Sequence, residues 1–146
     1  MRELPRQLTT GQLEELFEGR TTLVERLAAI EDPLDSADKV ISTLTEDEKL
    51  AALDAHPAIG QRAGLSARSA AEQGGGDDPA LLAELAELNR RYEERFGFRF
   101  VVFVDRRPKA EIVPILRKRL ERTREEELDT ALSELVSIAR DRWQRG

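Results

Sequence analysis

The sequence predicts an all-α fold: one compact domain over residues 1–146, with about seven to nine short helices and a long C-terminal helix. Three observations predict it. Aromatic residues make up only 5% of the chain, whereas alanine, leucine, glutamate and arginine dominate it. Helix-capping motifs recur along the sequence. Between them, apolar residues return at the spacing of one helical face.

Composition narrows the possible functions. The chain has no cysteine and one histidine, which excludes disulfide frameworks, thiolate zinc sites, cysteine nucleophiles and multi-histidine metal centres. A net charge of −6 argues against general nucleic-acid binding. No apolar run approaches the roughly 18 residues of a membrane span, and the N-terminus lacks the apolar region of a signal peptide. We therefore expect a cytoplasmic protein without a metal centre, nucleic-acid partner or membrane association.

Four helix starts are predicted in the first 56 residues, because a side chain there can accept a hydrogen bond from an amide of the first turn. They are Thr9 with Gln12, Thr22 with Glu25, Asp35 or Ser36, and Thr45 with Glu48. The last of these helices should stop before Pro57, since proline disfavours the α conformation in the residue that precedes it.

Further helices follow in the second half of the chain. Ser66 is the predicted start of a short helix up to Gln73, and Asp78-Pro79 that of a helix closed by Gly97. A third helix should begin at Pro108 or Pro114. Thr123 with Glu126 should begin the final helix towards Trp143. Residues 98–104 have the composition of a strand, but no other segment could pair with them convincingly. We predict a buried extended segment or a helix start there.

His56 is the one residue whose unperturbed pKa, about 6.5, lies near neutrality. Because Pro57 should end the helix, the imidazole is presented from a break in the chain. Two interpretations remain open. The histidine caps the last helical carbonyls, or it takes part in proton transfer.

Two other groups of polar residues also allow both a structural and a functional interpretation. Ser69, Glu72 and Gln73 share one face of their predicted helix, where they either bind a small polar ligand or lie in solvent. A basic cluster from Arg117 to Arg124 adjoins an acidic run, which is typical of an exposed, salt-bridged surface. An arginine of this cluster that faced inward could bind a carboxylate or a ureido oxygen bidentately.

Three motifs occur in order: His56–Gly60 (HPAIG), Ser69–Gln73 (SAAEQ), and Leu88–Tyr92 (LNRRY) leading to Phe96–Phe100 (FGFRF). With them, from about Leu13 to Arg140, the chain resembles the 2-oxo-4-hydroxy-4-carboxy-5-ureidoimidazoline (OHCU) decarboxylase family. The resemblance implies an all-helical protein, often a homodimer, that forms (S)-allantoin in urate degradation by a cofactor-free decarboxylation of a small anionic substrate.

The resemblance also implies roles for individual residues. His56 and Glu72 correspond to the catalytic pair, and Arg119 to an arginine that grips the substrate. The other substrate-binding residues that it implies are Pro57, Ser69, Gln73, Phe100 and Val101.

Two alternatives stay open at this stage. The chain could be a non-catalytic helical binding module, or a related enzyme that acts on another small anionic ureide. The second is suggested by departures from the family pattern at 19–22, Arg99 and Arg122.

Overall fold

The computed structural model describes residues 3–57 and 78–145. All the regular structure in these ranges is helical, in seven helices, which confirms the all-α prediction. The predicted short helix after Ser66, with Ser69, Glu72 and Gln73, lies outside the described residues.

Contacts divide the chain into two compact units. The N-terminal unit comprises Met1–His56 together with Leu132–Gly146, and the middle unit comprises Pro57–Ala131. Helix α8 (Arg124–Arg145) contributes residues to both. The single domain over 1–146 stays a prediction.

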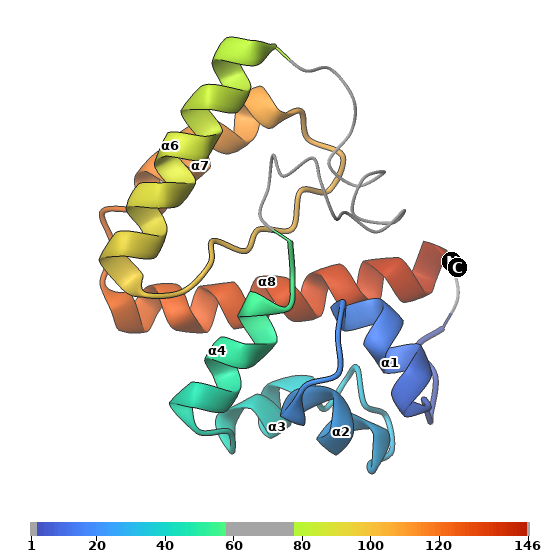
Figure 1. Ribbon diagram of the computed structural model, residues 1–146. Coiled ribbons are helices and arrows are strands. Elements are labelled where there is room, and N and C mark those ends of the chain that lie inside the picture. Colours follow the sequence, from blue (N-terminus) through green and yellow to red (C-terminus); the bar gives the residue numbers. More distant parts are fainter. Residues whose placement is uncertain (1–2, 58–77, 146) are drawn as a thin grey trace. The chain divides into compact units, whose positions relative to one another are not determined.

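The N-terminal unit contains four short helices: α1 (Thr10–Phe17), α2 (Thr22–Ala28), α3 (Ala37–Ser42) and α4 (Glu46–Asp54). Helix α2 contacts each of the other three, and Figure 1 shows the four helices as a group. Fully buried leucines fill the interior of the unit: Leu13, Leu23, Leu27, Leu34 and Leu53. Burying each of them stabilises the fold by roughly 1.5–3 kcal/mol, so the short helices depend on packing rather than on their length.

The helix starts of this unit largely follow the predictions. Thr9 and Thr45 both form complete capping boxes, with Gln12 and Glu48 respectively. The prediction that Thr22 is an N-cap is wrong by one residue. Thr21 has the extended backbone of an N-cap and accepts a hydrogen bond from the Val24 amide, so Thr22 is already helical. Ser36 precedes α3 but makes no side-chain capping bond.

The C-terminal part of α8 fastens the loops of the N-terminal unit through long side chains. Arg140 donates two hydrogen bonds to the Leu34 carbonyl, and Arg142 donates one to the Leu16 carbonyl at 3.0 Å. The indole of Trp143 donates to the carbonyl of Glu3. These bonds satisfy carbonyls in loops and at a helix end, which have no partner within their own element.

In the middle unit, α6 (Pro79–Phe96) lies beside α7 (Lys109–Arg119), as Figure 1 shows. Helix α6 begins and ends as predicted. The Asp78 side chain caps its start, and Gly97 ends it in the left-handed conformation at φ 79°. Helix α7 begins directly after Pro108 and continues through Pro114. Residue Thr123 makes the predicted capping interaction with Glu126 at the start of α8.

Residues 98–104 cross the middle unit without helical or strand structure, and most of their side chains are buried. The prediction of a buried extended segment is therefore confirmed. The Tyr92 ring packs edge-on against the rings of Phe98 and Phe100, with centroids 5.8 Å and 5.2 Å apart. These aromatic contacts explain the apolar composition, because the segment is part of the core of its unit.

Candidate active site

His56 follows the C-terminus of α4, which ends at Asp54. Its backbone amide donates to the Leu53 carbonyl at 3.1 Å, and its side chain is only 8% exposed. Pro57 is also buried. The chain thus breaks at His56 as the His-Pro sequence predicts, and the structure adds that the imidazole there is buried.

Three other predicted site residues come together in the middle unit. Arg119, the last residue of α7, is 6% exposed, and its Nη1 donates to the Val101 carbonyl at 2.7 Å. Its guanidinium carbon lies 4.6 Å from the centroid of the Phe100 ring, within the range of a cation–π contact. Arg119 is thus an arginine of the basic cluster that faces inward, a possibility that the sequence left open.

The carboxylate that pairs with Arg119 belongs to Glu127, a residue that was not among the predicted site residues. Its side chain is 0% exposed, and its Oε1 accepts from Arg119 Nε and from the Tyr92 hydroxyl, both at 2.6 Å. Its Oε2 accepts from Arg122 Nη1 at 2.8 Å. A signal for this residue exists in the sequence, because Glu127 continues the apolar stripe of α8 at four-residue spacing with Ala131.

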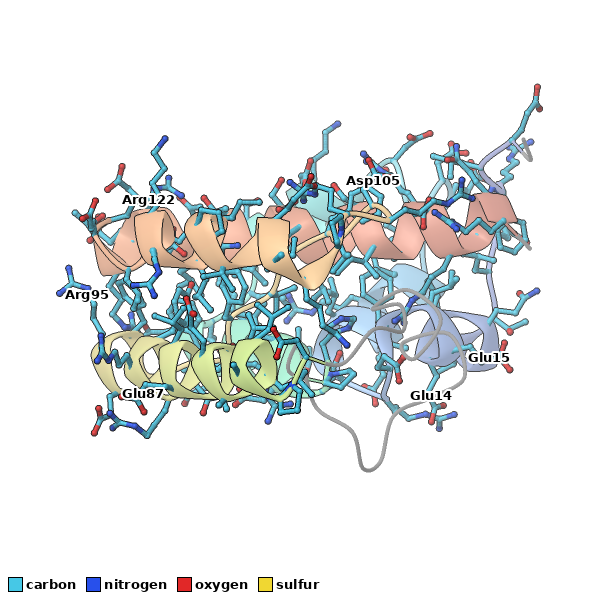
Figure 2. All side chains as sticks on the ribbon, turned by 90° about the horizontal axis from the view of Figure 1, so that it is seen from above. Glu14, Glu15, Glu87, Arg95, Asp105 and Arg122 are labelled. Carbon is cyan, nitrogen blue, oxygen red and sulfur yellow. The ribbon has the colours of Figure 1, made fainter. Side chains whose placement is uncertain are left out.

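The rest of the charged cluster behaves as a solvated surface, as expected. Arg117 pairs with Glu84 at 2.6 Å, and both side chains are at least two-fifths exposed. Figure 2 shows Glu87 pointing away from the interior of the middle unit, while Arg95 and Arg122 lie at the same end of it. Hydrogen bonds from Arg90 and Arg91 lower the pKa of the Glu87 carboxyl to about 2, but this group lies on the solvent-exposed surface.

Burial raises the pKa of the Tyr92 phenol well above its usual value near 10, and the hydrogen bond to Glu127 raises it further. The phenol therefore stays neutral over the physiological range. Its proton is the one shared with the Glu127 carboxylate, while Arg119 Nη2 approaches the phenol oxygen at 3.4 Å.

Among residues 3–57 and 78–145, no three His, Asp or Glu side chains cluster closely enough to hold a metal ion. None of the helices described there combines the length and the apolar character needed to cross a membrane.

The helical fold matches solved structures. One is a crystal structure of OHCU decarboxylase in the presence of (S)-allantoin, with a TM-score of 0.75 over 90% of this chain and 94% of that one, at 23% identity. Another is a crystal structure of (S)-allantoin synthase, with a TM-score of 0.67 and 25% identity over 91% of this chain and 47% of that one. The fold is therefore that of a known class of helical proteins that includes a decarboxylase.

Sequence comparison identifies the family. The family model for OHCU decarboxylase matches residues 2–144. The 2-oxo-4-hydroxy-4-carboxy-5-ureidoimidazoline decarboxylase of Haloferax volcanii is 33% identical over 137 residues, which cover 86% of this chain and 80% of that protein. The chain belongs to the OHCU decarboxylase family, which is a family of carboxy-lyases, and the resemblance drawn from the three motifs is confirmed.

A longer relative also matches. The uric acid degradation bifunctional protein PucL of Bacillus subtilis is 30% identical over 152 residues, covering 97% of this chain. The match spans only 31% of PucL, so the present chain corresponds to about a third of that protein. The names of the relatives place the family in urate degradation.

Proposed function

We propose that this chain decarboxylates 2-oxo-4-hydroxy-4-carboxy-5-ureidoimidazoline to (S)-allantoin in urate degradation, without a cofactor. The observation that carries the proposal is family membership over residues 2–144. The buried His56-Pro57 step supports it, because this motif gives the chain its one histidine in a desolvated position.

The proposed reaction breaks one C–C bond. The substrate bears a carboxylate and a hydroxyl on the same ring carbon, beside an imine-like ring system. When CO2 leaves, the bonding electron pair is delocalised into the adjacent C=N bond of the ring. A proton then adds to the neighbouring carbon, which bears the ureido group, while the hydroxyl loses its proton and becomes a carbonyl. The enzyme must hold the carboxylate out of the ring plane and deliver the proton to one face, which determines the chirality of the product.

We assign the proton transfer to His56, with Glu72 orienting the imidazole and stabilising its protonated form. A positioned acid or base of this kind contributes typically about 10²–10⁴-fold to the rate. We assign Pro57, Ser69 and Gln73 to the pocket wall. Residues Phe100 and Val101, which Arg119 contacts, complete the proposed substrate-binding set.

His56→Asn tests the assignment, because asparagine keeps hydrogen-bonding capacity but cannot exchange a proton near neutral pH. We expect a folded protein whose kcat is reduced by about a hundredfold or more. The assay follows stereospecific formation of (S)-allantoin by circular dichroism from freshly generated substrate, because the substrate also decays spontaneously. Turnover close to that of the unaltered protein would refute the role of His56.

Glu72→Gln should impair catalysis with little change in melting temperature. Glu87→Gln is a matched control, because Glu87 is an exposed carboxylate on α6 that pairs only with surface arginines in the described structure. It should leave activity intact. A large loss of stability in Glu72→Gln would instead make Glu72 a structural residue.

We further propose that the chain forms a homodimer, acts in the cytoplasm and binds no nucleic acid. Family resemblance suggests the dimer, and the charge of −6 disfavours nucleic-acid binding. Light scattering coupled to size-exclusion chromatography tests the oligomeric state directly, since a mass near 16.5 kDa would contradict a dimer.

A further inference from the structure

The buried segment 98–104 has an unusual source of hydrogen-bond donors. Buried backbone carbonyls need partners, which in a sheet come from a neighbouring strand. Here arginine side chains provide them. Arg107 donates to the carbonyls of Phe103 and Val104, and Arg119 donates to that of Val101. The conformation of the segment therefore depends on where these guanidinium groups are held.

Arg119 contacts two of the residues assigned to substrate binding, Phe100 and Val101. It stacks on the Phe100 ring and bonds the Val101 carbonyl at the same time. Its Nε is engaged by Glu127 and its Nη2 approaches the Tyr92 hydroxyl. Each of the three guanidinium nitrogens thus has a partner inside the middle unit, and the residue is 6% exposed, so its interactions are directed into the core of that unit.

Glu127 fixes the position of this guanidinium. Its carboxylate is fully buried and accepts hydrogen bonds on both oxygens, from Arg119 and Tyr92 on one and from Arg122 on the other. Charge-assisted bonds of this kind are short and about twice as strong as neutral ones. Because Arg119 and Tyr92 share Oε1, the two bonds to this one oxygen leave the Arg119 side chain little freedom to move.

We propose that Arg119, fixed by Glu127 and Tyr92, is a positioning residue that sets the Phe100 ring and the Val101 backbone for substrate binding, without contacting the substrate itself. The inference rests on the proposed function, which assigns those two residues to the substrate. Small displacements matter in such a place, since a misplacement of about 1 Å can reduce catalysis about a hundredfold.

Steady-state kinetics on Arg119→Lys and Tyr92→Phe tests the proposal. Lysine keeps the charge but cannot bond Glu127 and Val101 with the same fork, so we expect KM to rise about tenfold or more. Tyr92→Phe removes one neutral hydroxyl and should raise KM about two- to tenfold. The dissociation constant for (S)-allantoin, measured by calorimetry, should rise in parallel, while kcat per folded molecule changes less.

Arg122→Gln is the matched control. It removes a charged partner from the other oxygen of Glu127, but Arg122 makes no described contact with residues 98–104. We expect it to leave KM unchanged, although it can lower stability. Arg119→Met should raise KM more than Arg119→Lys does, provided that it folds.

A merely structural role predicts a different pattern. A destabilised enzyme contains fewer folded molecules, which lowers the apparent kcat and leaves KM unchanged. An unchanged KM in Arg119→Lys, or an equal rise of KM in Arg122→Gln, would overturn the proposal. If the unaltered protein forms no (S)-allantoin stereospecifically, the proposed function fails. If it does, and the Arg119→Lys variant keeps a normal KM, only the positioning role fails.

Discussion

In the described part of each unit, a buried arginine bonds both a carboxylate and a backbone carbonyl. In the middle unit Arg119 joins Glu127 and Val101, and in the N-terminal unit Arg142 joins Glu18 and Leu16. Both arginine side chains are less than a tenth exposed. The carboxylates differ, because the Glu127 side chain is 0% exposed and the Glu18 side chain is 14% exposed.

Because of this difference, removing the arginine should affect stability differently in the two units. Glu18 can be hydrated when its arginine is removed, and Leu16 belongs to a helix whose other bonds remain. Glu127 has no access to water, and Val101 belongs to a segment without helical bonds of its own. A buried pair is costly to break because one partner is left charged and desolvated, so the middle unit should depend far more on its arginine.

The largest effect is expected for Arg119→Met. Removing one partner of a buried ion pair typically costs about 3–5 kcal/mol of unfolding free energy, and we expect a loss in this range. Urea unfolding followed by circular dichroism measures it.

The double variant Arg119→Met with Glu127→Leu provides the control, because it also removes the buried carboxylate that has lost one of its two arginine partners, and it should recover much of the lost stability. A loss below about 1 kcal/mol in the single variant would show that water or a rearranged Arg122 compensates for the missing charge.

A smaller loss is expected for Arg142→Met. A hydrogen bond to a charged group contributes about 1.5–3 kcal/mol, and we expect a loss of about 2 kcal/mol, since Glu18 can reach solvent. The same urea titration measures it under the conditions used for Arg119→Met. The comparison between the two units breaks down if Arg142→Met is as destabilising as Arg119→Met.

The smallest effect at neutral pH is expected for Tyr92→Phe, at about 1 kcal/mol. The pH dependence of the unfolding free energy gives this variant a second use. The pKa of Tyr92 is raised in the folded state, so the unfolded chain loses this proton first, and the stability of the unaltered protein should fall as pH rises above about 10.

Tyr92→Phe lacks this phenol and should lose less stability over the same alkaline range. Unfolding free energies of the two proteins, measured between pH 8 and about 11, test the sign. Parallel curves would mean that Tyr92 ionises as readily in the folded protein as in the unfolded chain.

Local signals in the sequence determined much of the fold. The capping boxes at Thr9 and Thr45, the Asp78-Pro79 start and the Gly97 end appear as predicted, because each depends only on residues within one turn of a helix. The error at Thr22 has the same local origin. Two adjacent threonines can each accept the first-turn hydrogen bond, and the choice depends on the incoming backbone direction.

For the candidate site, too, some features could be predicted from the sequence and others could not. The motif around His56 and the family to which the chain belongs follow from the sequence, since the chemistry of a His-Pro step is a local property. The partnership of Glu72 with His56 stays a prediction. That Arg119 faces inward could not be deduced from the basic cluster, because composition does not show which member of a helical charge run is buried.

The sequence by itself thus determined the helical class, most helix ends and the family, all of which depend on residue types at short spacing. Only the tertiary structure decided that Glu127 joins Arg119 and Tyr92, and that Arg119 supplies a donor to the extended segment 98–104. The physical reason is that these bonds connect four separate parts of the chain: α6, segment 98–104, α7 and α8. These bonds are strong because water is excluded from them, and no single segment can exclude water alone.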